Sequence, residues 1–465
     1  MRGVIAALTT RPLEKVLYLA MFLTIAFVMT TPYYYLAIVP ALLIIFLVIS
    51  YSYPVYGYYA IIFLIPFGAY RNVSEASFLK VHWILALILT LYLLFKAFYQ
   101  RHMPSEVKSR LWPFVALLFV VDLISAMFSP YPATAFHDVG LFAAGGLFIL
   151  ISMFFIDKDA LFKYLPAVVV VSVSLSSFFG VIGYLFNISF FAENIEAGQF
   201  KRSLGGSTDP NNYVLMIAFA LPLLGAMFDK ARRPGAKLLY LGLIAINVLA
   251  VIFSFSRGGA LITAALLFVM FFKYIKKINV QLMFVQVFFV ALAVVLIWGV
   301  LPQSYTDHFK NIVNPKADPS IDRRATYLTV GIDSFFKHPI IGTGLGTFRD
   351  IYSESIDARR FSKEGFTNRR YAHNTYLEYM VGTGVIGFLL FAGIIVRSAK
   401  NFIAARKNFI STGDMESASH AGTYMLSFTI LMIYLFIYSD PFHKYLLFSI
   451  GLSQAMYRLS LPEKK

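Results

Sequence analysis

Long apolar runs recur along most of the chain, and they constrain its fold more than any other feature. A run of about 18 or more apolar residues is long enough to cross a hydrocarbon core of roughly 30 Å as a helix. The runs are of helical length and mostly lack the alternation of barrel strands. We interpret about fourteen of them as spans, at residues 13–30, 34–51, 54–70, 79–99, 111–128, 134–156, 163–187, 209–228, 237–256, 258–275, 279–300, 375–397, 420–438 and 443–459.

Composition supports this interpretation. Of the 465 residues, 59% are hydrophobic and 14% are charged, whereas soluble domains contain roughly 45–50% apolar and about 25% charged residues. We therefore predict an all-α polytopic membrane protein, a bundle of about 12–14 transmembrane helices with one long, partly helical loop. The predicted parts are spans and short loops over 1–300, the loop over 301–375, and C-terminal spans over 376–465.

Lysine and arginine cluster in alternate connections. With the N-terminus inside, the clusters near 96–110, 230–237, 273–277 and 397–407 all lie in cytoplasmic loops, and the opposite loops carry little charge. This is the positive-inside pattern, and it predicts cytoplasmic termini and an outer loop at 301–375. The net charge of +16 is then explained by anionic lipid on the cytoplasmic side and not by nucleic acid.

The outer loop contains a predicted amphipathic helix. It begins at Ser320-Ile321-Asp322 and continues through Lys337, with one apolar face at helical spacing. That face consists of Leu328, Ile332, Phe335 and Phe336. Pro339 and the glycines at 342, 344 and 346 end the helix. We expect it to lie on the membrane surface or on the helical bundle.

Two shorter outer segments carry arginines where charge is costly. Arg257 lies between two apolar runs, and an arginine at membrane depth costs several kcal/mol unless it is hydrated or paired. It either snorkels to the interface from a tight turn or binds an anion. Arg202 belongs to a glycine-rich segment that leads into a span, where Ser207, Thr208 or Asp209 can cap the helix. Capping does not account for Arg202 or for the pair Asn211-Asn212.

The long loop adds an arginine pair and two histidines. Arg323 and Arg324 open the amphipathic helix, and an arginine fork suits phosphate oxygens; a solvated face is the alternative. His373, beside Asn374, enters the next span and can accept a proton near neutrality. His338 precedes Pro339, and a purely structural role in that turn is the stronger interpretation. For the other arginines of the loop, a solvated surface is the default; these are Arg349, Arg359, Arg360, Arg369 and Arg370.

Several chemistries lack residues to carry them. The chain has no cysteine, which excludes disulfides, thiolate catalysis and thiol metal sites. Gly342-Thr343-Gly344-Leu345-Gly346 resembles part of a dinucleotide fingerprint, but it lacks the strand-turn-helix context that such a site requires. No P-loop and no acidic metal cluster are apparent. We therefore expect neither a cofactor nor a metal.

A set of motifs, taken in order, carries a family resemblance. The set runs from Arg202 to Pro210-Asn211, then Ser256-Arg257-Gly258-Gly259, Arg323-Arg324 with Tyr327, His338 to Gly346, and Ala372-His373-Asn374 through Glu378 to Gly387. It resembles the O-antigen ligase and O-antigen polymerase superfamily of bacterial membrane glycosyltransferases, over roughly residues 200 to 390. The spans nearer the N-terminus match only as generic hydrophobic helices.

The resemblance implies a GT-C-like enzyme of the bacterial inner membrane with its active site facing the periplasm. The donor would be a glycan on undecaprenyl diphosphate, and the acceptor a lipid A-core hydroxyl. Transfer would be metal-independent and inverting, with His373 as the base. Arg202, Arg257, Arg323 and Arg324 would bind the diphosphate, and Asn211, Asn374 and His338 would support them.

Alternative functions share these motifs. A polymerase would use another lipid-linked repeat as its acceptor, and a related enzyme would use a protein hydroxyl. A transporter or flippase of anionic glycolipid would use the same arginines for binding alone. The ligase is the favoured prediction.

Overall fold

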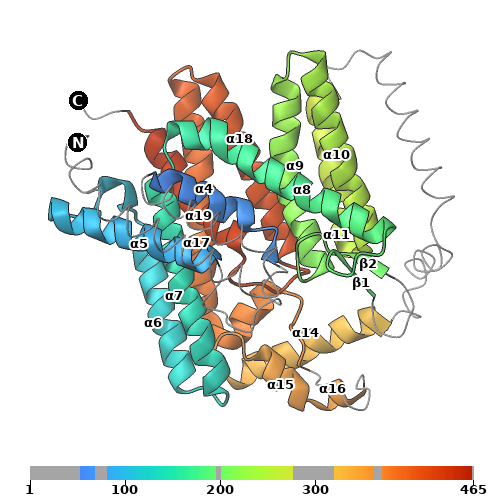
Figure 1. Cartoon of the computed structure of the whole chain (residues 1–465). Coiled ribbons are helices and arrows are strands. Elements are labelled where there is room, and N and C mark those ends of the chain that lie inside the picture. Colours follow the sequence, from blue (N-terminus) through green and yellow to red (C-terminus); the bar gives the residue numbers. More distant parts are fainter. Residues whose placement is uncertain (1–52, 69–80, 195–200, 276–318, 361–368, 463–465) are drawn as a thin grey trace, which may run out of the picture. The chain divides into compact units, whose positions relative to one another are not determined.

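The computed structural model describes residues 53–68, 81–194, 201–275, 319–360 and 369–462, and these form helices joined by short connections (Figure 1). The predicted spans at 13–30, 34–51 and 279–300 lie outside the described residues. The chain forms two compact units, one of residues 1–62 and 76–102 and one of residues 63–75 and 103–465. The first unit contains most of α4 (Pro54–Leu64) and all of α5 (Val81–Gln100).

The second unit contains the remaining described elements. They are η4 (Ser105–Val107), α6 (Trp112–Met127), α7 (Pro132–Phe155), the π-helical turn η5 (Ala160–Tyr164), α8 (Leu165–Leu185), β1 (Ala192–Asn194), β2 (Lys201–Ser203), α9 (Pro210–Lys230), α10 (Pro234–Ser254), α11 (Arg257–Ile275), α14 (Pro319–Lys337), α15 (Phe348–Glu354), α16 (Ile356–Arg360), α17 (Thr375–Ser411), α18 (Met415–Tyr434) and α19 (Lys444–Leu459). Within the described residues, 5 helices are long and apolar enough to cross a membrane, and shorter apolar helices accompany them. The prediction of an all-α polytopic membrane protein is confirmed.

The predicted spans that fall in the described residues coincide with helices. The largest difference is α17, which continues to Ser411 instead of ending near residue 397. The sequence analysis predicted a loop at 397–407, and this prediction is wrong. The basic residues there lie on the helix, namely Arg397, Lys400, Arg406 and Lys407. The reason is local: no glycine or proline occurs between Gly393 and Gly413, so nothing interrupts the helix before the positive φ of Gly413.

Contacts between helix ends agree with the predicted alternation of the chain. The turn after α9 meets the start of α18, where Lys230 binds Glu416 at 2.7 Å. At the other end of the bundle, His443 lies 3.0 Å from Asn212, joining the starts of α19 and α9. The Tyr131 hydroxyl donates to Glu354 at 2.6 Å there, joining the start of α7 to α15. Lys230 and the loop helix α15 thus lie at opposite ends of the helices of the second unit.

The helix α17 is interrupted near its start. Gly384 has φ of 62° and ψ of −165°, which is not helical. The loop that follows α14 binds the backbone groups freed by this break. The amide of Gly344 donates to the Gly382 carbonyl at 2.8 Å, and the amide of Val385 donates to the Pro339 carbonyl at 2.8 Å. A break in an apolar helix requires such partners, because unpaired backbone groups are costly away from water.

Glycines make this interlock sterically feasible. Gly342 and Gly344 both have positive φ, and a Cβ on Gly342 would overlap the backbone of Gly382. Conversely, a Cβ on Gly382 would lie 2.7 Å from the Cα of Leu345. The glycine pattern that resembled a nucleotide loop therefore serves close backbone packing.

The amphipathic helix α14 packs with a face that the apolar spacing did not indicate. Tyr327, Gly331 and Ser334 are its buried residues, and Gly331 allows Leu377 of α17 to approach, since a Cβ there would be 2.8 Å from a Leu377 methyl carbon. Leu328, Ile332 and Phe336 remain exposed, Phe336 by 73%. Around the buried Tyr327, α14, α15 and the start of α17 form one apolar cluster.

Candidate active site

His373 lies in the short connection before α17 and has an unusual backbone. Its φ is 52°, in the left-handed region that residues other than glycine seldom adopt. Its ring packs near that of Tyr327, with 5.8 Å between centroids. The Nδ1 atom is buried and has no hydrogen-bond partner among the described residues.

The surroundings of His373 keep its ring neutral. Burial, followed by the positive charge of Arg324, lowers the pKa of His373 from 6.5 to about 4. Arg370 and Arg323 act in the same direction, and Asp209 opposes them. At neutral pH the imidazole is therefore unprotonated and able to accept a proton.

The positive charges of Arg323 and Arg324 both act on His373. Arg324 is exposed and Arg323 is half-buried, yet both act electrostatically on the imidazole. Burial raises the pKa of Tyr327, and Arg370 and the same pair act against that shift. The charges of these two arginines of α14 thus act on both rings, those of His373 and Tyr327.

The N-terminus of α9 supplies the next part of the site. Asp209 caps the helix, and its carboxylate accepts from the amides of Asn211 at 2.7 Å and Asn212 at 2.9 Å; the predicted cap is confirmed. The Asn211 side chain accepts a hydrogen bond from the Ser256 hydroxyl at 2.7 Å. Ser256 also lies 3.5 Å from the Tyr434 hydroxyl. The asparagine pair therefore ties α9 to neighbouring elements.

Arg202 binds the backbone of the turn that precedes Arg257. Its Nε donates to the Ser254 carbonyl at 2.8 Å, and its Nη2 donates to the Phe255 carbonyl at 3.2 Å. These carbonyls end α10, whose cap residue Phe255 is left-handed with φ of 55°. A cation at a helix C-terminus is stabilising. The guanidinium therefore has a structural role as well as a place in the site.

Arg257 is the first residue of α11 and is half-buried. It follows Ser256 directly, so its position depends on the turn that Arg202 and Asn211 hold. Gly259 lets Tyr434 pack there, because a Cβ would lie 2.6 Å from the tyrosine hydroxyl. The charges of Asp209, Arg202 and Arg324 all act on that buried hydroxyl.

These contacts bring most of the predicted residues to one region. Tyr434 is in electrostatic reach of Arg202 and Arg324, and Arg324 is in reach of His373. Asn374 caps α17, since its side chain accepts from the amides of Tyr376 at 3.0 Å and Leu377 at 3.1 Å. That contact gives it a local structural role.

His338 lies apart from this region. It is exposed just after α14, while the arginine pair lies near the other end of the helix. At a rise of about 1.5 Å per residue, the separation from Arg324 along α14 is roughly 20 Å. The structure therefore does not bring His338 near the arginine pair that acts on His373.

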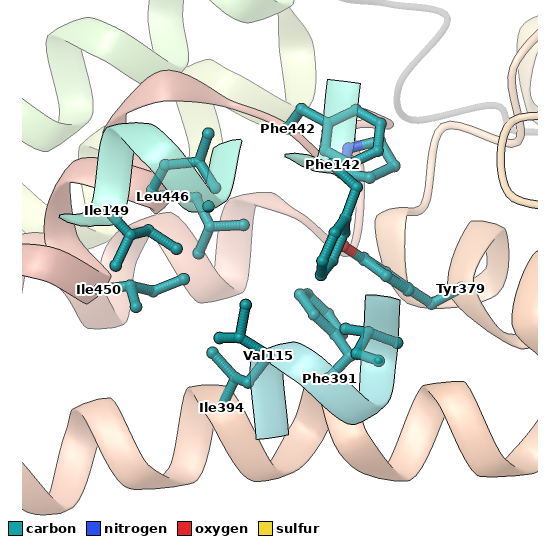
Figure 2. Close-up of a pocket in the computed structure, with 13 residues that line it drawn as sticks. Val115, Phe142, Ile149, Tyr379, Phe391, Ile394, Phe442, Leu446 and Ile450 are labelled. Atoms are coloured by element: carbon teal, nitrogen blue, oxygen red, sulfur yellow. The ribbon is translucent and has the colours of Figure 1, made fainter. Parts of the chain in front are cut away.

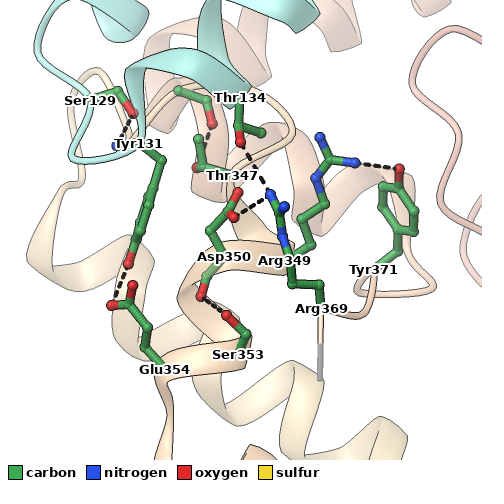
Figure 3. Close-up of polar contacts among 11 residues, drawn as sticks. Ser129, Tyr131, Thr134, Thr347, Arg349, Asp350, Ser353, Glu354, Arg369 and Tyr371 are labelled. Carbon is green, nitrogen blue, oxygen red and sulfur yellow. Dashed lines mark hydrogen bonds and ion pairs between the residues drawn. The ribbon is translucent and has the colours of Figure 1, made fainter. Parts of the chain in front are cut away.

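A second polar cluster joins the loop helices to the start of α7 (Figure 3). Arg369 forms an ion pair with Asp350 and donates to Thr134 at 3.3 Å. Arg349 donates to the Tyr371 hydroxyl at 3.0 Å and lies over its ring. Arg349 is half-buried, so a solvated surface does not describe it, whereas Arg369 is exposed as the default predicted and is also ion-paired. Arg359 and Arg360 are exposed on α16.

An apolar cavity of about 30 Å³ lies among α6, α7, α17 and α19 (Figure 2). Its lining includes Val115, Phe142, Tyr379, Phe391 and Phe442, and no lining residue is charged. A diphosphate requires cationic or N–H partners. This cavity is therefore not the anion site.

Three residues of the region escaped the sequence reasoning. The sequence around Tyr434 and His443 is typical of a membrane span and of a turn, and it carries no sign of a site. Only the fold brings these two residues to α9. Arg370 had a solvated surface as its default, but it is half-buried beside His373 and Tyr327. Its position three residues before His373 in the sequence was the available signal.

A family model described as O-antigen ligase matches residues 240–392. The matched region contains Arg257, Arg323, Arg324 and His373, whereas Arg202 and Asn211 precede it. No curated protein matches the chain. Residues 240–392 are thus similar to the O-antigen ligase family, in agreement with the resemblance that the ordered motifs carry.

Proposed function

We propose that this protein transfers a polysaccharide from undecaprenyl diphosphate to a hydroxyl of lipid A-core, on the periplasmic face of the bacterial inner membrane. The observation that carries the proposal is the position of His373. A neutral imidazole with its pKa lowered to about 4 lies beside Arg323, Arg324 and Arg370. This pairs a proton acceptor with an anion-binding region, which are the two elements that such a transfer requires.

The reaction needs no external energy, because the bond between the sugar C1 and the diphosphate is already activated. The acceptor hydroxyl oxygen attacks C1 from the face opposite the diphosphate, and the anomeric centre inverts. As the new C–O bond forms, the hydroxyl proton passes to His373. The old C1–O bond breaks, and its electron pair leaves with the lipid diphosphate.

The arginines stabilise this leaving group. Two or more guanidinium groups around a diphosphate neutralise charge that grows in the transition state, and each can bind oxygens bidentately. Arg323 and Arg324 would act from α14 and Arg257 from α11. Arg202 would act mainly by holding the turn at Ser254 and Phe255. Asn211 would support Arg257 through Ser256, and Asn374 would fix the start of α17.

Purified protein in lipid nanodiscs tests this proposal. Given lipid-linked polysaccharide and lipid A-core, the wild type should form the covalent glycolipid, and His373→Ala should lower the rate about 10²- to 10⁴-fold, the usual contribution of a positioned base. His102→Ala, at an exposed histidine of the first unit, is the matched control. Wild-type transfer by His373→Ala would contradict the base assignment.

The choice of acceptor in the same assay separates related functions. Joining of two lipid-linked glycans, without transfer to lipid A-core, would identify a polymerase. Transfer to a protein hydroxyl would identify an enzyme that glycosylates proteins. Translocation without any covalent product would identify a transporter.

A further inference from the structure

The connection that carries His373 is held from both sides by backbone hydrogen bonds. On the N-terminal side, the amide of Ala372 donates to the Glu378 carboxylate at 2.8 Å. On the C-terminal side, the amide of Asn374 donates to the Ser439 hydroxyl oxygen at 2.9 Å. The two residues that flank His373 are thus anchored to different elements.

These two anchors are neighbours. The Ser439 side chain lies close to the Glu378 carboxylate, and the two groups hold the amides on either side of His373. Glu378 is 1% exposed, and a buried carboxylate is tolerated only where such partners surround it. We call Glu378 and Ser439 the His373 bracket.

The segment behind Ser439 is fixed as well. The Thr375 amide donates to the Leu435 carbonyl at 2.9 Å, and its hydroxyl donates to the Tyr438 carbonyl at 2.7 Å. The amide of Asp440 returns a bond to the Thr375 hydroxyl at 3.1 Å. The connection between α18 and α19 therefore forms a rigid base for the bracket.

The bracket explains how the left-handed backbone conformation of His373 is maintained. A left-handed residue other than glycine costs about 1 kcal/mol or more and persists where its surroundings determine it. His373 has this conformation at φ of 52°. With the amides on both sides anchored, its ring is directed toward Tyr327 and the arginines instead of toward solvent.

We infer that Glu378, together with Ser439, is a positioning residue for the transfer reaction, which fixes His373 in its left-handed conformation for proton acceptance. This inference rests on the proposed role of His373 and adds the residues through which the fold controls it. Glu378 does not touch substrate in this mechanism. It acts only through the backbone of the histidine connection.

Kinetics of the full-length protein in nanodiscs test the inference. Glu378→Ala should lower kcat about 10²-fold, the usual cost of a misplaced catalytic group, with the KM for the lipid-linked donor within about threefold because the arginines are unchanged. Glu378→Gln keeps an oxygen for the Ala372 amide and should retain most of the rate. Ser439→Ala removes one anchor and leaves a smaller cavity than Glu378→Ala does. It should lower kcat by an amount between those of Glu378→Gln and Glu378→Ala. Glu416→Ala, at an exposed carboxylate, is the control.

A double-mutant cycle separates positioning from general destabilisation. In a His373→Ala background, Glu378→Ala should cause no further loss of residual rate. An equal fractional loss in both backgrounds would overturn the inference, as would a rise in KM at unchanged kcat.

A readout without turnover separates this inference from the proposed function. Diethyl pyrocarbonate should modify His373 several-fold faster in Glu378→Ala than in the wild type or Glu416→Ala, as measured by peptide mass spectrometry. Faster modification together with full activity of His373→Ala would leave the bracket standing and remove the base role. Unchanged modification would overturn the bracket itself.

Discussion

The Nε of Arg202 donates a 2.8 Å hydrogen bond to the carbonyl oxygen of Ser254, 52 residues later in the chain. This bond joins β2 to the C-terminus of α10 and sets the turn from which Arg257 emerges. An arginine that sequence motifs assign to a substrate thus also holds the backbone beneath a second arginine.

Replacing Arg202 should therefore affect stability as well as activity. Arg202→Ala leaves two carbonyl groups without their charged donor, and the free energy of unfolding should fall by about 1–2 kcal/mol. Arg202→Lys keeps the charge but cannot span both carbonyls, so part of this loss should remain. Thermal unfolding in nanodiscs measures it, with the exposed Arg232→Ala as control. Unchanged melting of Arg202→Ala would contradict the structural role.

Activity should fall on the acidic side at a lower pH in the free enzyme than in the substrate complex. Because the pKa of His373 is lowered to about 4, the base form persists well below pH 6.5. The acidic decline of kcat/KM should therefore begin well below pH 6.5. A bound diphosphate offsets the arginine charges, which raises the pKa, so the acidic decline of kcat should lie at higher pH. Identical declines near pH 6.5 would contradict this account.

The same shift affects stability. In the unfolded chain the histidine pKa is near 6.5, so between pH 6.5 and about 4 the unfolded state binds more protons at His373 than the folded state does. The contribution of His373 is therefore present above pH 6.5 and is lost as the pH falls through this window. His373→Ala should flatten the decline of melting temperature over that range. An equally steep decline in the variant would assign it to other groups.

The break in α17 should not tolerate a side chain. In Gly384→Ala the new Cβ meets the Ile340 backbone at a positive φ, and strained backbone of this kind costs roughly 1–3 kcal/mol before any overlap is counted. We expect loss of folded protein by size-exclusion chromatography. Gly140→Ala, where no atom lies within 4 Å of the new Cβ, is the helical control. Normal folding of Gly384→Ala would show that the interlock is dispensable.

The absence of cysteine allows a direct test of orientation. A cysteine at Ile356, which is 85% exposed on α16, should react with a membrane-impermeant maleimide added to cells with a permeabilised outer membrane. A cysteine at Gly235, near the start of α10, should react only after the inner membrane is opened. The reverse pattern would invert the predicted topology.

The sequence predicted the helices well, because hydrophobic length and charge alternation are local signals. Asp209 as a cap, the end of α14 and the all-α architecture followed from neighbouring residues alone. The packing face of α14 did not, because apolar spacing cannot distinguish a face that contacts protein from one left exposed. In the structure, Tyr327 and Gly331 pack on α17 and Leu328 does not.

The candidate site was predictable only in part, because local sequence does not determine which distant residues pack together. Ordered motifs indicated Arg257, Arg324 and His373. Tyr434 was missed because its role depends on contact with Ser256, 178 residues earlier. The bond from Arg202 to Ser254 was likewise beyond local reasoning, since a side chain's partner across the fold is decided by packing.

The interlock at Gly384 also has a consequence for biogenesis. The Thr343 hydroxyl and the Val381 carbonyl that it binds are 38 residues apart, and the outer loop is synthesised before α17. In the proposed topology, that loop reaches the periplasm before the span that completes its packing is inserted. Until the two meet, neither the arginines of α14 nor His373 has its final neighbours, so under the proposed function a half-inserted chain would be inactive toward lipid-linked sugars.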